Sequence, residues 1–306
     1  MHVLIPAETL EPIGGIQIHS LLISQELVRR GHQISVMYVK DGALRPEYEA
    51  IGSVTQVPTF SFSRRSAARD LMHLVPTVRS MARARPDVIY PQRPEEIVAG
   101  IIGGRLARAP VVLHLHGFET LRRVVLAGRF GVRYIAVSHF IRDFWVEAGL
   151  DPHTIEVVHN GVDPRDYPFG GLAERARARA DLGLPPDAFV VLYFGRIDAE
   201  KGAEVLLDAW RRLGIRPETG RLRLVGSPRL TGEGYMIRLR ENAPPGCHWL
   251  PMRRDVITPL HAADVVVVPS TYDEPFGRAV IEGMATGRPV VTSRVGGMPE
   301  ILEGDV

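Results

Sequence analysis

Arg196 and Lys201 stand five residues apart, directly after an apolar run that ends at Phe194. A guanidinium fork together with a compact ammonium group suits a diphosphate, whose negative charge must grow when it departs as a leaving group. The alternative is a solvated loop with an Arg–Glu pair. Lys40 and Lys201 are the only lysines among 37 cationic residues, so a lysine kept at position 201 favours the phosphate interpretation.

Glu274 and Glu282 form a second pair, on either side of a predicted loop-to-helix junction. Eight residues at a rise of about 1.5 Å would separate them by roughly 12 Å if the segment were helical throughout. This exceeds the roughly 5–9.5 Å between the two carboxyl groups of a glycosidase. We therefore expect the two carboxylates to bind separate parts of one long ligand, with the amides of Gly277 and Arg278 meeting a phosphate between them.

Two further features lie in the first half of the chain. Gly14 and Gly15 separate a predicted strand from a predicted helix, where missing side chains let a ligand approach backbone N–H groups. A plain turn explains the pair equally well, since no third glycine completes a dinucleotide fingerprint. His116 ends an apolar run and precedes a glycine, and we favour it over His114 as a ligand-facing histidine. A histidine satisfied inside the core is the alternative.

Alternating strand and helix patterns must position these residues, and such alternation predicts parallel, doubly wound sheets. The series restarts after Pro185 and Pro186, so we predict two Rossmann-like domains, 1–168 and 169–306. An Arg/Ala run at 173–180 is expected to form an exposed linker helix. The expected strands are 2–6, 34–39, 88–90, 111–116, 134–137, 155–159, 190–194, 222–225, 248–250, 265–268 and 290–292. The expected helices are 16–30, 95–108, 139–148, 172–182, 203–213, 234–241 and 278–286.

Composition narrows the class of protein. The chain has 306 residues, of which 45% are hydrophobic and 24% are charged, which suits two globular domains with filled cores. A formal net charge of +2 gives no sign of a nucleic-acid partner. No leader or membrane-length apolar run is found, so a cytoplasmic protein is expected. Cys247 is the single cysteine, which excludes an internal disulfide and a thiolate metal cage.

Taken together, the motifs resemble those of the family 4 retaining glycosyltransferases, over almost the whole chain. The matching segments are Gly14-Gly15, Gly31-His32, His116-Gly117, Ala136 to Ser138, Asn160 to Asp163, Gly195-Arg196, Lys201-Gly202, Val225-Gly226, Ala263-Asp264, Pro269-Ser270, the Glu274/Glu282 pair and Gly296 to Glu300. The resemblance implies the GT-B fold, with two Rossmann-like domains facing a cleft. The first would be the acceptor-side domain and the second the nucleotide-sugar domain. Against this family pattern the chain is expected to be C-terminally shortened.

The resemblance also implies roles for single residues. Arg196 and Lys201 would bind the diphosphate, Glu282 the ribose hydroxyls and Glu274 the hydroxyls of the donor sugar. His116 would face the reacting sugar, and Gly15 would approach the diphosphate. The implied catalytic group is His116, Arg196, Lys201 and Glu274. The implied donor-binding set is Gly14, Gly15, Arg196, Lys201, Met252, Arg253, Glu274, Phe276, Gly277, Arg278 and Glu282.

The implied reaction moves a hexose from a nucleotide-diphosphate sugar to an acceptor hydroxyl with retention, and the leaving diphosphate helps to deprotonate the acceptor. No cofactor is expected. The lack of any Asp-x-Asp pair further predicts that no metal ion takes part, because Arg196 and Lys201 supply the positive charge. Two other functions stay open: a nucleotide-sugar 2-epimerase of the same fold, and a non-catalytic nucleotide-sugar-binding fragment. The Gly226-Ser227-Pro228 segment departs from the family pattern, so the donor base stays open, as do the sugar and the acceptor.

An arginine-rich stretch marks the first domain. Residues 60–133 hold 13 arginines against 5 acidic residues. They could bind an anionic acceptor or rest on the inner face of a membrane, and a solvated helix face is the alternative. The clusters are Arg64-Arg65-Arg69, Arg79-Arg83-Arg85 and Arg122-Arg123-Arg129-Arg133, beside the apolar residues Leu71, Met72, Leu74 and Val75.

Overall fold

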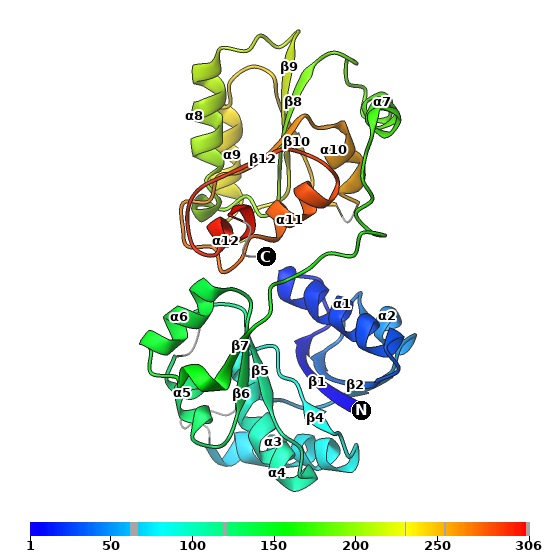
Figure 1. Cartoon of the computed structure of the whole chain (residues 1–306), viewed down its shortest axis with the longest axis vertical. Coiled ribbons are helices and arrows are strands. Elements are labelled where there is room, and N and C mark those ends of the chain that lie inside the picture. The colour runs from blue at the N-terminus through cyan, green and yellow to red at the C-terminus, as the bar shows by residue number, and fades with distance from the viewer. Residues whose placement is uncertain (62–66, 119–120, 230, 254, 304–306) are drawn as a thin grey trace. The chain divides into compact units, whose positions relative to one another are not determined.

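The computed structural model describes residues 1–61, 67–118, 121–229, 231–253 and 255–303, apart from the side chains of 67–71 and 121. The chain divides into two compact units, Met1–Asn160 and Gly161–Val306. Each is an α/β unit with parallel sheets (Figure 1). From the sequence, the domain boundary is predicted between residues 168 and 169. In the structure, residues 161–168 belong to the second unit.

The first unit is built on two parallel sheets, β3-β2-β1-β4 and β5-β6-β7, joined by a bridge between Ile89 and Val111. Its strands are β1 (His2–Thr9), β2 (Gln33–Lys40), β3 (Ser53–Gln56), β4 (Val88–Ile89), β5 (Val112–Leu115), β6 (Arg133–Ala136) and β7 (Ile155–Val157). Its helices are α1 (Gly15–Arg29), α2 (Arg45–Glu49), α3 (Ala67–Arg83), α4 (Ile97–Ala107), α5 (Leu121–Gly128) and α6 (His139–Glu147), with 3₁₀ turns at Pro94–Glu96 and Pro152–Thr154.

The second unit has a five-stranded parallel sheet in the order β10-β9-β8-β11-β12. Its strands are β8 (Phe189–Phe194), β9 (Gly220–Val225), β10 (Cys247–Leu250), β11 (Val265–Val268) and β12 (Val290–Thr292). Its helices are α7 (Leu172–Asp181), α8 (Ala203–Leu213), α9 (Glu233–Glu241), α10 (Ile257–Ala262), α11 (Arg278–Ala285) and α12 (Met298–Leu302), with a 3₁₀ turn at Ala199–Lys201.

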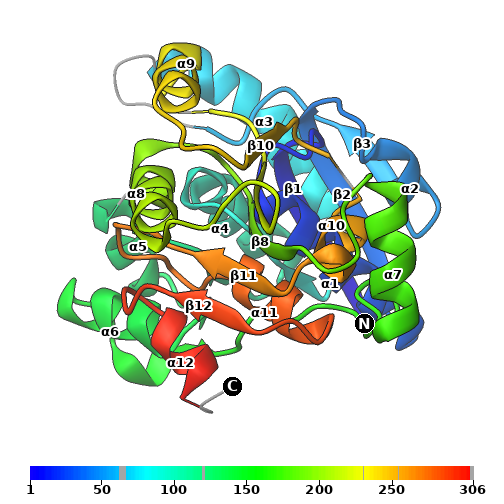
Figure 2. The same cartoon turned by 90° about the horizontal axis from the view of Figure 1, so that it is seen from above.

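Both faces of β8 are buried, which explains its unbroken apolar sequence. Side chains alternate between the two faces of a strand. Val191 and Tyr193 pack in one core with α8 and α9, whereas Leu192 and Phe194 pack in the other with residues of α10. Figures 1 and 2 show α8 and α9 along one face of this sheet and α7 and α10 along the other. The central strand is therefore a rigid support for the loop that follows it.

The Arg/Ala helix is largely exposed, as expected, but it is not a linker, because Ala178 and Arg179 are buried within the second unit. Arg179 of α7 is only 1% exposed. Its guanidinium donates to the carbonyl oxygens of Ala262 at 3.1 Å and Ala188 at 2.8 Å, and it pairs with Asp264 at 2.7 Å. Asp264 also pairs with Arg175 at 2.6 Å. Burial opposes ionisation of Asp264, but the Val190 amide and the two arginines lower its pKa below the usual value.

The segment before α7 is also fastened to the second unit. The carbonyl of Pro168 lies 2.9 Å from Nε2 of His261, and the Gly170 amide donates to the Thr286 carbonyl at 3.1 Å. The Arg288 guanidinium donates to the Gly170 carbonyl. These contacts tie the start of α7 to the second sheet and its helices.

Among the described residues, no helix is both long enough and apolar enough to cross a membrane.

Candidate functional site

The site begins at the carboxyl end of β8, where parallel α/β sheets place their ligands. Arg196 follows the strand directly, and Lys201 ends the 3₁₀ turn Ala199–Lys201. Gly202 comes next with φ +72°, and a Cβ there would lie 1.8 Å from the Pro269 carbonyl oxygen. Glycine at 202 therefore lets the Lys201 segment touch the loop after β11, which carries Glu274.

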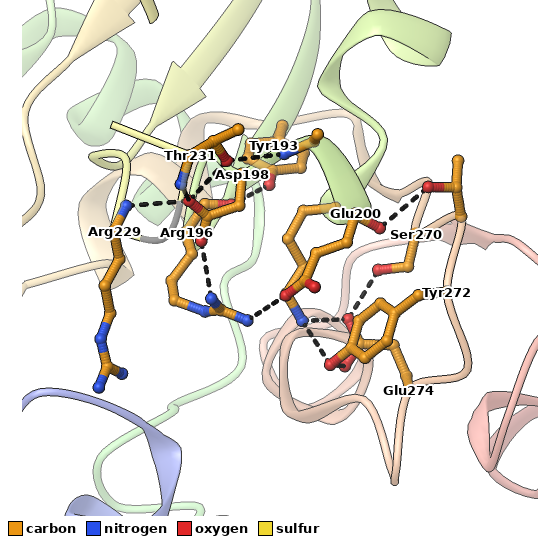
Figure 3. Close-up of polar contacts among 12 residues, drawn as sticks. Tyr193, Arg196, Asp198, Glu200, Arg229, Thr231, Ser270, Tyr272 and Glu274 are labelled. Carbon is orange, nitrogen blue, oxygen red and sulfur yellow. Dashed lines mark hydrogen bonds and ion pairs between the residues drawn. The ribbon is translucent and has the colours of Figure 1, made fainter. Parts of the chain in front are cut away.

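Lys201 and Glu274 form a half-buried ion pair at 2.5 Å, although 73 residues separate them. Tyr272 lies beside both, since its hydroxyl accepts from Lys201 Nζ at 3.1 Å and donates to Glu274 Oε2 at 3.1 Å. Ser270 donates to Glu274 Oε1 at 2.6 Å (Figure 3). Gly296, at φ +58°, packs on the Glu274 backbone, where a Cβ would lie 2.1 Å from its carbonyl oxygen. The Glu274 carboxylate is thus held from several sides.

Arg196 also lies among carboxylates. Its guanidinium donates to Asp198 Oδ2 at 2.7 Å and to Glu200 Oε1 at 2.7 Å, and the Tyr193 hydroxyl donates to its carbonyl oxygen. The Arg–Glu pair that was the alternative interpretation therefore exists, but its guanidinium is only 23% exposed rather than freely solvated. The net effect of its carboxylate neighbours is to raise the pKa of Arg196 although burial opposes this, so the group stays cationic.

Asp198 organises this loop. It is 1% exposed, and its Oδ1 accepts from the main-chain amides of Arg229 at 2.9 Å and Thr231 at 3.1 Å, and from the Thr231 hydroxyl at 3.0 Å. Its Oδ2 accepts from Arg196 (Figure 3). One buried carboxylate thus joins the loop after β9 to the cation that follows β8.

Two cations, Arg196 and Lys201, therefore stand among three carboxylates, those of Asp198, Glu200 and Glu274. An anion that binds here must compete with at least one carboxylate. Glu200 is the most exposed of the three, with 34% of its side chain accessible against 1% for Asp198 and 11% for Glu274. It is the carboxylate that can leave at the lowest cost, because its charge can return to water.

Glu282 is 8% exposed and lies in α11, one turn after Arg278. Arg278 donates to Glu282 Oε1 from Nε at 3.0 Å and from Nη2 at 2.7 Å. Gly277 caps the helix with φ +109°. Phe276 is 3% exposed, so its ring belongs to the core and only its main chain could contact a ligand.

Met252 and Arg253 lie in the loop between β10 and α10. Met252 is exposed, and its amide contacts the Ser227 hydroxyl at 3.4 Å. Arg253 pairs with Asp255 at 3.2 Å. This loop and the Ser227 segment therefore lie side by side, at the carboxyl ends of β10 and β9.

In the first unit, Gly14 caps α1 with extended backbone, φ −174°, and Gly15 begins the helix. His116 follows β5 and is partly buried, whereas His114 is 2% exposed and its Nδ1 lies 2.6 Å from the Tyr90 hydroxyl. His114 is thus a histidine inside the core, which was the alternative interpretation for the two histidines at 114 and 116. His116 lies 3.1 Å from Oε1 of Gln92.

The structure brings together Arg196, Lys201 and Glu274, while Gly14, Gly15 and His116 belong to the other unit. Sequence reasoning missed the partners Asp198, Tyr272 and Gln92, and it named Ser270 only as part of a family motif, without a role. Asp198 lies between Arg196 and Lys201 in the sequence, so a search for acceptors near each cation would have found it. Gln92 gave no sequence signal.

Two parallel-sheet Rossmann-like units, with cations and carboxylates at the carboxyl ends of the second sheet, define a glycosyltransferase of the GT-B fold. Residues 13–166 match Glycosyltransferase Family 4, and residues 188–306 match the glycosyl transferases group 1. The chain belongs to glycosyltransferase family 4.

The relatives found by sequence similarity are also named glycosyltransferases. An uncharacterized glycosyltransferase of Methanocaldococcus jannaschii is 27% identical, over 96% of this chain and 80% of the relative. D-inositol 3-phosphate glycosyltransferases of Corynebacterium efficiens and Mycobacterium tuberculosis are 35% and 38% identical. Those two matches span 51% and 49% of this chain, and 38% and 31% of theirs.

Solved structures show the same fold. The complex of Anabaena HepE with UDP and glucose has a TM-score of 0.82 at 27% identity, over 98% of this chain and 83% of that one. WaaG, a glycosyltransferase involved in lipopolysaccharide biosynthesis, has a TM-score of 0.69 at 17% identity, over 99% and 84% of the two chains. The predictions of a GT-B fold and of a family 4 glycosyltransferase are confirmed.

Proposed function

We propose that this glycosyltransferase moves a hexose from a nucleotide-diphosphate sugar to an acceptor hydroxyl, with retention and without a metal ion. The observation that carries the proposal is the ion pair of Lys201 with Glu274 at the carboxyl ends of β8 and β11, with the second cation, Arg196, in the same loop after β8. A fixed guanidinium and a fixed ammonium stabilise a diphosphate as it gains negative charge, which is the role a metal would otherwise take.

Each side chain then has one task. Arg196 and Lys201 bind the diphosphate, and Glu200 gives up Arg196 to it. Glu274, held by Ser270 and Tyr272, accepts hydrogen bonds from hydroxyls of the donor sugar.

The reaction itself breaks the bond between the anomeric carbon and the diphosphate oxygen, and the electron pair leaves with the diphosphate. The acceptor oxygen bonds to the same face of that carbon, and its proton passes to a diphosphate oxygen.

Glu282 would bind the ribose hydroxyls. Because Arg278 occupies Oε1, we expect Oε2 to accept from the ribose. Met252 and Arg253 would frame the base. The complexes of the related HepE with UDP, with UDP and glucose, and with UDP-glucose make a UDP-sugar the first donor to test.

A panel of UDP-, GDP- and TDP-sugars tests this proposal, read by thermal stabilisation and by release of the nucleotide. A ligand that binds only the folded state raises the melting temperature. The anomeric configuration of the product, read by NMR, tests retention. A product of inverted configuration would refute the retaining mechanism, and stabilisation by no member of the panel would refute the donor site.

The same panel separates the other two functions. A 2-epimerase would convert or hydrolyse the donor with no acceptor present and would yield a sugar epimeric at C2. A non-catalytic binding protein would be stabilised by a donor but would release no nucleotide. The ion-paired Glu274 favours transfer, since it offers a fixed carboxylate to the sugar hydroxyls.

We further propose that the first unit contacts anionic membrane lipid or an anionic acceptor through the face formed by α4 and α5. This face exposes large apolar side chains, namely Ile102, Leu106, Leu126 and Phe130. Five arginines of the same stretch of chain are also exposed, namely Arg105, Arg108, Arg122, Arg129 and Arg133. Arg105 lies 5.1 Å from the Phe130 ring centre, at the rim of a cavity of about 290 Å³. Apolar and cationic side chains on one face suit an anionic interface.

This location differs in part from the sequence expectation. Leu74 is 1% exposed and cannot reach a membrane, whereas Met72 is 67% exposed. Arg64, Arg65 and the side chains of Arg69 and Leu71 lie outside the described residues.

Sedimentation with phosphatidylglycerol vesicles and with phosphatidylcholine vesicles tests the surface. Arg129→Glu with Arg133→Glu should abolish binding to the anionic vesicles, whereas Arg212→Glu, an exposed arginine of the second unit, should not. Equal binding of the unaltered chain, the double variant and Arg212→Glu to the anionic vesicles would refute a role for this face in membrane contact. If none of them binds, an anionic acceptor is the remaining ligand for this face, and binding of inorganic phosphate tests it.

A further inference from the structure

Gln92 has an amide whose two ends face different partners. Its Nε2 group lies 3.4 Å from the Tyr90 carbonyl oxygen, and its Oε1 lies 3.1 Å from Nε2 of His116. A carbonyl oxygen can only accept, so the NH₂ end must point at Tyr90. The carbonyl end then points at His116, and Nε2 of His116 must carry the proton that it donates.

The position of Gln92 is fixed by a buried carboxyl group. Gln92 is 5% exposed and Glu96 is 1% exposed. Glu96 accepts from the main-chain amides of Gln92 at 2.9 Å, Arg93 at 3.1 Å and Glu8 at 3.3 Å. It thereby joins the ends of β1 and β4. The glutamine is therefore held by its backbone as well as by its amide.

His116 lies in a cluster of three histidines. Its ring stacks on His114, with 4.1 Å between centres, and meets the ring of His19 of α1 edge-on at 5.5 Å. Burial, together with His19 and Arg93, lowers the pKa of His116 well below 6.5. The ring is therefore neutral at ordinary pH and has one N–H and one lone pair.

We propose that Gln92 is a positioning residue that locks His116 in its Nε2–H form, so that Nδ1 offers a lone pair to a ligand hydroxyl. Among the described residues, Nδ1 has no hydrogen-bond partner in the first unit. In the glycosyl transfer proposed above, on which this role rests, His116 accepts a hydrogen bond from a sugar hydroxyl. A histidine in the other tautomer would present an N–H there, so it could only donate to the hydroxyl oxygen and could not accept the hydroxyl proton.

Nitrogen NMR of the imidazole rings tests the tautomer without any substrate. Correlations from the carbon-bound ring protons distinguish a protonated from an unprotonated nitrogen, and His116→Asn identifies the signals of His116 by their loss. In the unaltered chain we expect Nε2 protonated and Nδ1 unprotonated at pH 7. Gln92→Met has a similar length but no acceptor, so its His116 signals should move to the averaged values of a tautomer mixture.

Gln56→Met is the matched control, because Gln56 donates only to the Val39 carbonyl from an exposed site in the same unit. It should leave the His116 signals unchanged. A predominantly Nδ1–H form in the unaltered chain, or unchanged His116 signals in Gln92→Met, would overturn the proposal. Thermal unfolding of both variants checks that the fold is kept.

Kinetics then separate this proposal from the proposed function. Gln92→Met should lower kcat/KM by about tenfold while the affinity for free UDP is unchanged, because free UDP lacks the donor hexose whose hydroxyl His116 would contact. A chain that transfers no sugar but shows the Nε2–H tautomer would refute the proposed function alone. An active chain in which Gln92→Met matches Gln56→Met in kcat/KM would refute the role of Gln92.

Discussion

Asp198→Asn should loosen Arg196 while the loop keeps its other bonds. The three groups that donate to Oδ1, from Arg229 and Thr231, require an acceptor. The asparagine oxygen must therefore face them, which turns the NH₂ group toward Arg196. A charge-assisted hydrogen bond of 2.7 Å is then lost, and two donors oppose each other in its place.

The expected loss in the free energy of unfolding depends on which partners Arg196 keeps in the Asp198→Asn variant. A hydrogen bond to a charged group contributes about 1.5–3 kcal/mol, and removal of one partner of a buried ion pair costs about 3–5 kcal/mol. Arg196 keeps Glu200 as a partner at 2.7 Å, so we expect a loss near the lower end, about 2 kcal/mol. Asp198→Ala also leaves the Oδ1 donors unsatisfied and should cost about 4 kcal/mol. If Arg196 binds the diphosphate, its misplacement should also weaken UDP binding by about tenfold, or about 1.4 kcal/mol.

Urea unfolding and calorimetric titration with UDP measure the two quantities. Asp208→Asn is the matched control, since Asp208 is an exposed α8 residue that pairs with Arg211 and Arg212. Exposed pairs contribute about 0–1 kcal/mol. If Asp198→Asn equals Asp208→Asn in stability and in UDP affinity, the buried carboxylate does not organise the site and the reasoning fails.

Arg196→Ala or Lys201→Ala should each lower kcat by roughly 10²-fold, as loss of charge stabilisation in the transition state commonly does; unchanged kcat in both would exclude them from the donor site. Activity should persist in excess EDTA, because fixed cations replace the metal, whereas complete loss restored by Mg²⁺ or Mn²⁺ would contradict this. Arg179→Met should cost about 3–5 kcal/mol in urea unfolding, since it leaves Asp264 and buried carbonyls with too few donors; a cost under about 1 kcal/mol would refute the buried network. The lowered pKa of Asp264 gives stability that is present above about pH 4 and is lost as pH falls through that lowered pKa. Burial raises the pKa of Glu96 from 4.5 to about 8, so the folded chain holds a proton that the unfolded chain releases, and stability should fall as pH rises from 4.5 to 8; a pH slope that Glu96→Gln leaves intact would exclude this group.

The strands and helices that the sequence predicts best are those with a strong repeating pattern. The expected bounds of β11 and β12 match the structure, because both are unbroken β-branched runs. The strand β3 and the helix α3 were missed for physical reasons. β3 is mostly exposed and lacks an apolar alternation, and α3 contains Pro76, which ordinarily ends a helix.

The sequence singled out candidate site residues but could not predict which of them pair. Arg196 and Lys201 were singled out from their residue types, from their place after a predicted strand and from the family resemblance. The partner of Lys201 was not predictable, because Glu274 comes close only once β8 and β11 become neighbours in the sheet. Asp198 was overlooked for a related reason. Its partners at 229 and 231 follow β9, the other neighbour of β8.

The anchoring of residues 168–170 sets a limit on how the second unit could be reused as a separate protein. A separate protein made from the second unit would have to start ahead of Pro168, and not at the first residue of α7 or β8. A later start would remove the Pro168 carbonyl beside His261 and the Gly170 carbonyl, one of the three acceptors of Arg288. Loss of α7 would strip Asp264 of both arginines and leave its charge beside β8. Residues 168–170 and α7, which by sequence look like a connection between two domains, are therefore part of the second unit. Any shortened protein that contains this unit must include them.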